Sequence, residues 1–368
     1  MIRVGFIGAV TCEWTGGLNY YRNLLYALRT HEADAIAPIA FLGRRAEPYQ
    51  KELFREGARV VEHPLFDPGT APNLVDRALL RATGVRLGLE ALLDAHGVDV
   101  LSHSNVPGLV TRPTVNWIPD FQHLHLPHLF TREQLAWRDA HFTRLAERSA
   151  AVVVSSRAAA RDFAAFAPAW AHKCRVLPFV SQPIPGYAAL GARDAAVLRR
   201  AYAIDGPYFY LPNQFWAHKN HRVAFEAVRI LKARGRKIRL VCTGPTEDYR
   251  NRGFIGDLER FVDAHGLRDE IRLLGLVPYD DVFKLMKFSI AVINPSLFEG
   301  WSSTVEECKS VGKPMILSDL DVHEEQYPEA AFFPRDDAEA LAALLDRGGF
   351  GEARPADVPE RTRLFAAG

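Results

Sequence analysis

The sequence predicts an α/β protein with two doubly wound domains, each a parallel sheet with helices on both faces. Short apolar runs alternate with amphipathic helical patterns along most of the chain, which is typical of parallel sheets. The pattern restarts near residue 207, after a stretch rich in Pro, Gly and Ala at 181–194, and 368 residues suit two domains. We therefore expect domains over 1–185 and 195–350, followed by a C-terminal tail over 351–368.

The expected elements follow in order along the chain. In the first half, the strands are RVGFIGAV (3–10), AIAPIAFLG (35–43), VDVLSHS (98–104), TVNWIPD (114–120) and AVVVSS (151–156), with helices at 18–30 and 132–150. In the second half, the strands are YFYLP (208–212), 238–244, 271–276, 290–296, 314–319 and 330–333, with helices around 219–233, 256–265, 280–287 and 304–311. Ligands of such folds bind at the carboxyl ends of the strands, so a cleft between facing halves would be the site.

Composition narrows the class of protein. The charges nearly cancel, at 45 basic and 44 acidic residues, which gives no case for nucleic-acid binding. Four scattered cysteines without a C-x-x-C pair favour a reducing cytosol over a disulfide framework. No apolar run approaches the roughly 20 residues of a membrane span, and the opening segment resembles a strand rather than a signal peptide. Arg77, Arg81 and Arg86, among apolar residues, suit either a membrane surface or a solvated helix face.

The most informative stretch is EGWSSTVEE, from Glu299 to Glu307, between an apolar strand and a helix that Gly312 closes. Ser303 and Glu306 fit a capping box, and a helix start offers free N–H groups and a positive dipole end to an anion. Two carboxylates beside an anion site suit a ligand that combines hydroxyls with phosphate, such as a nucleotide sugar. The alternative is that the helix dipole alone favours two glutamates there.

Other candidates stand at strand ends or helix starts. Lys219, before a helix, is placed either to meet phosphate or simply to be solvated. Asp120 ends a strand, and the loop after it carries His123, His125 and His128. We favour a loop that hydrogen-bonds a sugar over a metal site there, because Pro127 interrupts the stretch.

Two further motifs carry weaker signals. Gly16-Gly17 before a helix allows either close backbone approach to a ligand or an ordinary tight turn. The G-x-G-x-x-G fingerprint is absent there, which disfavours a nicotinamide enzyme. Asp319 and Asp321 form a D-x-D pair, which we interpret as turn chemistry rather than a metal site.

With these residues in view, the chain resembles the retaining GT-B glycosyltransferases of family 4, also called glycosyl transferases group 1. The resemblance is strongest over 207–345, where Glu299 and Glu307 match the E-x7-E signature and FEGWSSTVEECKSVGKPMILSD runs in register. QFWAHKNH matches the phosphate-binding strand end through Lys219, and the likeness over 1–180 is looser. The fold that this implies is two Rossmann-like domains facing across a cleft, the first on the acceptor side and the second binding the donor.

The resemblance implies a role for each matching position. Lys219 would neutralise the donor diphosphate, Glu307 would bind ribose, and Glu299 would hold sugar hydroxyls near the reacting carbon. Asp120 and His123 would serve catalysis from the first domain. The remaining donor-site positions would be Gly16, Gly17, Gln214, Val277, Gly300, Trp301, Ser302, Ser303 and Thr304, with amides near the last three on phosphate and the backbone of Leu276 and Val277 on the base.

Three positions depart from the family pattern. Gln214 replaces the usual arginine five residues before the lysine, which gives up a charge-assisted hydrogen bond of roughly 1.5–3 kcal/mol unless another basic group stands in. Ser302 replaces a glycine, and its backbone can still bind phosphate, with less conformational freedom than a glycine has. Pro119 replaces a histidine before Asp120, so His123 is the expected substitute.

The resemblance implies transfer of a sugar from a UDP-, GDP- or dTDP-linked donor to a saccharide or lipid-linked saccharide hydroxyl. It also implies that the reaction retains the anomeric configuration and uses no metal and no cofactor. The implied pathway is cell-surface polysaccharide or lipopolysaccharide synthesis, and the implied location is the cytoplasm or the inner membrane face. The alternatives are a GT-B nucleotide-sugar epimerase or sugar phosphorylase, and a non-catalytic subunit that binds sugar nucleotides. Neither the sequence nor the resemblance predicts an oligomeric state.

Overall fold

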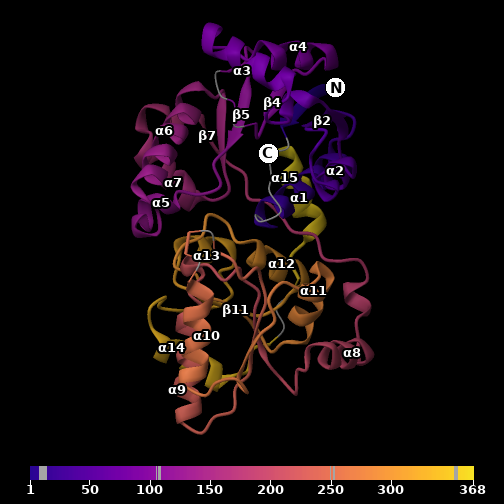
Figure 1. The fold of residues 1–368 in the computed structure, drawn as a ribbon. Coiled ribbons are helices and arrows are strands. Elements are labelled where there is room, and N and C mark those ends of the chain that lie inside the picture. The colour runs from indigo at the N-terminus through magenta and orange to yellow at the C-terminus, as the bar shows by residue number, and fades with distance from the viewer. Residues whose placement is uncertain (8–14, 105, 107–108, 249, 252, 352–354) are drawn as a thin grey trace. The chain divides into compact units, whose positions relative to one another are not determined.

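The chain folds into two compact α/β units (Figure 1). The structure, a computed structural model, describes all residues apart from 8–14, 105, 107–108, 249, 252 and 352–354. Unit 1 comprises residues 1–123, 131–180 and 359–368, and unit 2 comprises residues 124–130 and 181–358. The chain therefore passes between the units four times.

Unit 1 is built on a seven-stranded parallel sheet of order β3-β2-β1-β4-β5-β6-β7. The strands are β1 (Ile2–Ile7), β2 (Ile36–Leu42), β3 (Arg59–Glu62), β4 (Val100–Ser102), β5 (Thr114–Trp117), β6 (Ala151–Val154) and β7 (Cys174–Val176). The helices of this half are α1 (Thr15–His31), α2 (Pro48–Arg55), α3 (Ala71–Thr83), α4 (Leu87–His96), α5 (Gln122–His125), α6 (Arg132–Arg148) and α7 (Arg157–Phe166). The five predicted strands are present, although residues 8–10 of the first lie outside the described residues.

Unit 2 is built on a six-stranded parallel sheet of order β10-β9-β8-β11-β12-β13, so the strand order reverses between β8 and β11. The strands are β8 (Phe209–Leu211), β9 (Leu240–Cys242), β10 (Ile271–Leu273), β11 (Val292–Asn294), β12 (Met315–Ser318) and β13 (Ala331–Phe333). The helices are α8 (Ala192–Tyr202), α9 (His221–Ala233), α10 (Phe254–Ala264), α11 (Tyr279–Phe288), α12 (Ser303–Val311), α13 (Asp321–Gln326) and α14 (Ala338–Arg347). All six strands of this half were predicted.

Helices cover both faces of the unit 2 sheet, which explains why its four central strands β8, β9, β11 and β12 are buried along their whole length. Phe209 and Leu211 belong to a core cluster that includes residues of α9, α10 and α14. Tyr208 and Tyr210 point to the other face and join a cluster that includes residues of α8, α11 and α12. This two-residue alternation buries every position of β8, so both faces of the sheet are closed to water at this strand.

The last residues form a helix that the sequence did not predict. Helix α15 (Val358–Ala367) buries Phe365, whose ring meets the edge of Tyr20 in α1 at 6.2 Å between centroids. Gly349, Gly351 and Pro355 precede the helix, so the composition indicates a tail. Burial of Phe365 in unit 1 supplies the stability that the local sequence does not.

The two short edge strands β3 and β7 of unit 1 were also missed. Their sequences, RVVE and CRV, carry charged residues and are too short to give a strand pattern. They form because a neighbouring strand is already in place, β2 beside β3 and β6 beside β7. Edge strands of this kind depend on tertiary pairing more than on local propensity.

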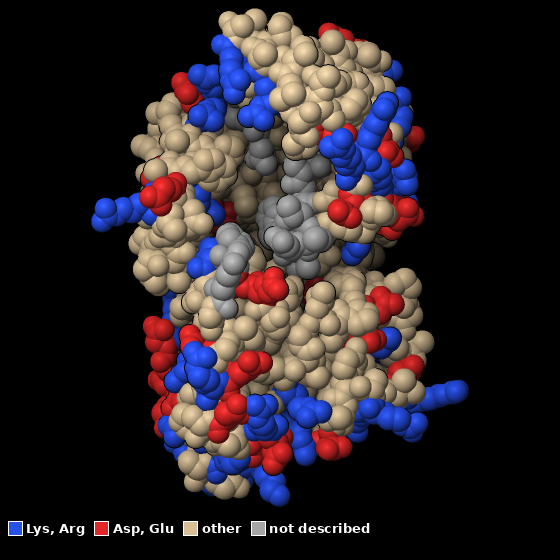
Figure 2. All heavy atoms as spheres, viewed as in Figure 1, with Lys and Arg blue, Asp and Glu red and all other residues tan. Residues whose placement is uncertain are grey.

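The surface of unit 2 carries mixed charge. On the face drawn in Figure 2, basic and acidic side chains are interspersed over the part that carries α9, α10 and α14.

In unit 1, Arg86 is held in an ion pair, its Nε lying 2.6 Å from Oδ2 of the buried Asp76. None of the helices that the structure describes is long and apolar enough to cross a membrane.

Candidate active site

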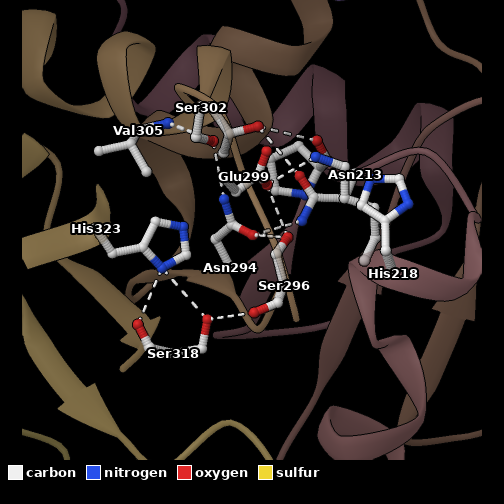
Figure 3. Close-up of polar contacts among 12 residues, drawn as sticks. Asn213, His218, Asn294, Ser296, Glu299, Ser302, Val305, Ser318 and His323 are labelled. Atoms are coloured by element: carbon white, nitrogen blue, oxygen red, sulfur yellow. Dashed lines mark hydrogen bonds and ion pairs between the residues drawn. The ribbon is translucent and has the colours of Figure 1, made fainter. Parts of the chain in front are cut away.

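Two strand ends and one helix start meet in unit 2 at the point where the strand order reverses. Asn294 ends β11, Asn213 follows the adjacent β8, and Ser302 precedes α12. Side chains from all three gather in one buried polar cluster (Figure 3). A reversal of strand order leaves a crevice at the carboxyl edge of a doubly wound sheet, so this is the expected place for a ligand.

Hydrogen bonds tie this helix start to the sheet. The Nδ2 of Asn213 donates to Oδ1 of Asn294 at 3.0 Å, and the Nδ2 of Asn294 donates to Oγ of Ser302 at 2.9 Å. The Oγ1 of Thr304 returns a hydrogen bond to Oδ1 of Asn213 at 3.2 Å. Because these groups are buried, each bond also avoids the roughly 1–3 kcal/mol cost of an unsatisfied polar group. The network fixes where α12 begins.

The cap of α12 differs from the predicted capping box. Ser302 is the N-cap, and its Oγ accepts from the N–H of Val305 at 3.4 Å, so Ser303 is the first helical residue. Glu306 is therefore one position too far along the helix to return a capping bond. It accepts instead from Nε2 of Gln326 at 3.1 Å and from Nζ of Lys309 at 3.3 Å. The capping-box prediction was wrong by one residue because the bond from Asn294 selects Ser302.

Only part of the predicted set of amides remains open. The N–H of Ser302 donates to Oε1 of Gln326 at 3.0 Å, while Nε2 of Gln326 donates back to the Ser302 carbonyl at 2.8 Å. The N–H groups of Ser303 and Thr304 have no acceptor among the described residues. These two groups stand at the positive end of the helix dipole and are available to an anion.

Lys219 and Glu299 form an ion pair, with 2.7 Å between Nζ and Oε1 and side chains 15% and 7% exposed. Lys219 ends the short 3₁₀ helix η5 (Ala217–Lys219), and Glu299 lies in the loop before α12. The Oγ of Ser296 also donates to the carboxylate at 2.7 Å. Burial alone would raise the pKa of Glu299, but the Lys219 ammonium and these hydrogen bonds outweigh it and hold the pKa below its ordinary value. The carboxylate is therefore ionised at neutral pH.

Glu307 lies four residues into the same helix, in a different environment. Its Oε1 accepts a hydrogen bond from the hydroxyl of Tyr279, the first residue of α11, at 2.9 Å. Burial raises the pKa of Glu307 to about 7, and the Tyr279 bond opposes this only in part. The two signature glutamates are thus electrostatically distinct, one held ionised and one poised to titrate near neutral pH.

The loops beside this cluster hold the other predicted donor-site residues. Leu276 is 72% exposed while Val277 is buried, so only the first presents its side chain to solvent. Gly300 and Trp301 lie between Glu299 and the N-cap, with Nζ of Lys309 5.9 Å from the Trp301 ring centroid. Val277 belongs to the same apolar cluster as Val305 of α12.

Gln214 stands close to a basic group that the sequence did not single out. The carbonyl of Gln214 accepts from the N–H of Trp216, whose ring lies 4.8 Å from Cζ of Arg250. The Nη2 of Arg250 is also 3.3 Å from Nδ1 of His218, the residue before Lys219. A guanidinium therefore lies beside the segment that carries Lys219, and it pairs with Asp248 at 3.5 Å.

Unit 1 carries the predicted residues Asp120 and His123. Asp120 lies three residues beyond the end of β5 and accepts from Nη2 of Arg138 at 2.6 Å. His123 is buried among Phe121, Phe142 and Phe166, with ring centroids 5.3–6.2 Å away. Burial lowers the pKa of His123, so the ring is neutral at pH 7.

Gly16 and Gly17 were predicted to precede a helix. They lie instead in the first turn of α1. Residues 8–14, which precede α1 in the sequence, are outside the described residues.

In the part of the chain that the structure describes, the residues of the two candidate metal motifs are not gathered into a larger group of metal-ligating side chains. No group of three or more His, Cys, Asp or Glu side chains gathers there, so His123, His125 and His128 do not converge. Asp319 accepts from Nε of Arg335 at 2.8 Å and from its main-chain N–H at 3.0 Å. The first aspartate of the D-x-D pair is thus part of a turn held by an ion pair.

The sequence reasoning missed the residues that hold this cluster together. Asn213 and Asn294 carried a usable signal, because each is a polar residue at the end of an apolar strand. Tyr279 and Gln326 gave none, since their partners Glu307 and Ser302 are 28 and 24 residues away. Ser296 and His323 contact residues only three and five positions away, but residue type alone does not indicate those contacts.

A glycine beside Asn213 gives a stability prediction. Gly244 has a φ of +144°, and a Cβ there would lie 2.4 Å from the Asn213 carbonyl oxygen. We expect Gly244→Ala to lower the free energy of unfolding by about 3 kcal/mol or more, since strain and clash combine. Gly235→Ala is the matched control, because its φ is +73° with nothing within 4 Å, and should cost only about 1–2 kcal/mol. Equal losses in urea unfolding would contradict the clash.

Comparison with known proteins agrees with the fold. The two parallel-sheet, Rossmann-like units match structures of the GT-B glycosyltransferase fold. HepE of Anabaena, in complex with UDP and glucose, gives a TM-score of 0.70 at 13% identity, covering 100% of this chain and 93% of that chain. WaaG, a glycosyltransferase involved in lipopolysaccharide biosynthesis, gives 0.62 at 15% identity, covering 99% and 95%.

Sequence comparison gives two further matches, of which the family model falls within the second unit. Residues 198–348 match the family model described as Glycosyl transferases group 1. Alpha-D-kanosaminyltransferase of Streptomyces kanamyceticus is 25% identical over 186 residues, which make up 50% of this chain and 45% of that enzyme. The match with that relative thus spans about half of its length.

Proposed function

We propose that the protein is a glycosyltransferase that takes a sugar from a nucleotide-diphosphate donor bound by unit 2. The observation that carries the proposal is the gathering of Lys219, Glu299 and the open start of α12 in the unit that matches the family model. One ammonium and two unpaired amides suit a diphosphate, and adjoining carboxylates suit hydroxyls. HepE, which shares the fold, binds UDP and glucose, and this supports a uridine donor as the first to test.

Each group has a defined task in this proposal. The N–H groups of Ser303 and Thr304 donate to the diphosphate, and Lys219 shares its ammonium between Glu299 and the phosphate. Glu307 accepts from ribose hydroxyls, for which its carboxylate must be ionised. Negative charge grows on the leaving phosphate as the bond to the sugar carbon breaks, so these fixed positive groups lower the barrier.

We further propose that the reaction retains the anomeric configuration and needs no metal. The acceptor oxygen bonds to the sugar carbon on the face from which the nucleotide leaves, and the acceptor's proton passes to the departing phosphate oxygen. The acceptor in this proposal is a saccharide or lipid-linked saccharide in cell-surface polysaccharide or lipopolysaccharide synthesis. Asp120 and His123 are proposed to act on the acceptor side, and the reaction is placed in the cytoplasm or at the inner membrane face.

A ligand screen followed by turnover tests this function. We expect UDP-, GDP- or dTDP-linked sugars to raise the melting temperature of the full chain, since ligand at 100 times Kd adds about 2.7 kcal/mol. The best donor is then incubated with saccharide acceptors, with and without chelator, and the products are analysed by nuclear magnetic resonance. A retained linkage that forms in the presence of chelator supports the proposal. Epimerised sugar or sugar phosphate would favour another GT-B enzyme, and binding without turnover a non-catalytic subunit.

A further inference from the structure

One buried side chain beside Glu299 has no assigned task. His323 lies in the first turn of α13, which follows β12, and it is fully buried. Its Nδ1 lies 3.0 Å from the carbonyl oxygen of Ser318 and 3.3 Å from Oγ of the same residue. A carbonyl oxygen only accepts, so Nδ1 must carry the proton. The Oγ of Ser318 donates its own hydrogen to the Ser296 carbonyl at 2.6 Å, and it too is an acceptor toward His323.

The tautomer leaves the other ring nitrogen as a bare acceptor. Burial lowers the pKa of His323, and this outweighs the opposing effect of the Glu299 carboxylate, so the ring is neutral and Nε2 has a free lone pair. Nε2 is buried and makes no hydrogen bond to any described residue. In Figure 3, Nδ1 points to Ser318 while the opposite edge of the ring is turned toward Asn294 and Ser302. A buried acceptor without a hydrogen bond is unfavourable, and a ligand that supplies a donor would remove that cost.

The chemistry of the surroundings narrows that ligand. A lone pair repels phosphate oxygens, so Nε2 does not serve the diphosphate. Glu299 is also an acceptor, and its charge is close enough to affect the titration of His323. Nε2 of His323 and the Glu299 carboxylate are both acceptors, so their ligand must carry several O–H donors. In a nucleotide sugar bound as proposed, the group nearest Glu299 is the sugar, which carries such hydroxyls.

We infer that Nε2 of His323 accepts a hydrogen bond from a hydroxyl of the transferred sugar and so helps to select which sugar the site takes. This inference rests on the proposed function, because it concerns the donor of that reaction. His323 touches a non-reacting part of the donor and is a specificity residue. A donor that lacks the hydroxyl in question would leave Nε2 unpaired and bind less well.

Paired variants separate the two ring nitrogens. His323→Asn keeps an N–H donor near the position of Nδ1 but has no acceptor at Nε2, whereas His323→Gln places an amide near Nε2. The control is His265→Asn, because Nδ1 of His265 is likewise 2.9 Å from a main-chain carbonyl, that of Phe261, at the end of α10. Calorimetry on the full chain compares UDP with UDP-glucose, or the nucleotide and sugar nucleotide that the wild type binds best.

We expect His323→Asn to weaken binding of the sugar nucleotide by about 5–30-fold, the loss of one hydrogen bond, while UDP affinity stays within twofold. His323→Gln should recover part of the loss and His265→Asn should change neither affinity. The test then uses monodeoxy analogues of the donor, each lacking one sugar hydroxyl. One analogue should bind the wild type more weakly than the parent donor does. The same analogue should bind the Asn variant as tightly as the parent donor binds that variant. That analogue identifies the hydroxyl.

Two results would overturn the inference while leaving the proposed function intact. One is unchanged sugar-nucleotide affinity in both His323 variants, with their melting temperatures near that of the wild type. The other is an equal loss for UDP and the sugar nucleotide, which would mean that the variants act through the fold. A wild-type chain that binds no sugar nucleotide would instead overturn the proposed function, and the inference with it.

Discussion

Lys219→Met should lower turnover by about 10²–10³-fold, the range seen when one fixed positive or donor group is removed from a developing anion. It should also destabilise the protein, because Glu299 would remain buried at 7% exposure without its cation. Breaking a buried ion pair by removing one partner costs about 3–5 kcal/mol. Turnover is measured at saturating donor, and stability by urea unfolding of the same preparation.

The double variant Lys219→Met/Glu299→Gln distinguishes the two effects. Removing both charges leaves no uncompensated carboxylate, so most of the lost stability should return, since neutral replacement of a buried pair is often close to neutral in energy. Turnover should not return, because the diphosphate still lacks its ammonium. If activity recovered together with stability, Lys219 would act only by holding Glu299.

Glu307 should make stability fall with rising pH. Its pKa in the folded chain is about 7, raised from 4.5 mainly by burial, so the folded state binds this proton more tightly than the unfolded chain. The contribution is fully present below pH 4.5 and is lost as pH rises through 7. The shift corresponds to about 3 kcal/mol. Glu307→Gln should remove this slope, measured by urea unfolding at intervals of pH.

Tyr279→Phe is the matched variant for that measurement. The Tyr279 hydroxyl donates to Glu307 and lowers the pKa of that carboxyl. Loss of the hydroxyl should therefore raise the pH at which the Glu307 contribution to stability is lost. Nucleotide affinity provides a second readout, because only the ionised carboxylate accepts from both ribose hydroxyls. Affinity in the wild type should therefore rise as pH passes through 7, and this rise should be absent in Glu307→Gln. A wild-type slope that persisted in Glu307→Gln would assign it to another group.

The candidate site was predicted from sequence where its signals were local. EGWSSTVEE lies next to an apolar strand and opens a helix, so both glutamates were placed correctly relative to β11 and α12. The partners of these glutamates were not predictable in the same way. Lys219 and Glu299 are 80 residues apart, and the pairing of β8 with β11 brings their loops together.

Tertiary contacts also decided the local details that sequence reasoning missed. Ser302 and Ser303 are equally good caps by residue type, and a hydrogen bond from Asn294, eight residues earlier, chooses between them. The sequence did not single out His323, and the unpaired lone pair on its buried Nε2 follows from the hydrogen bond between Nδ1 and the Ser318 carbonyl. Similarly, α15 forms because Phe365 finds a buried position in unit 1.

The interleaved assignment of segments to the two units determines how this chain can be dissected. A fragment that ends at residue 180 would carry 124–130 without the body these residues belong to, and would lack α15. Its complement, 181–368, would keep α15 but no surface for Phe365 to pack on. Independent folding of a half would therefore require moving 359–368 onto the first fragment and 124–130 onto the second, so the gene does not split at a single junction.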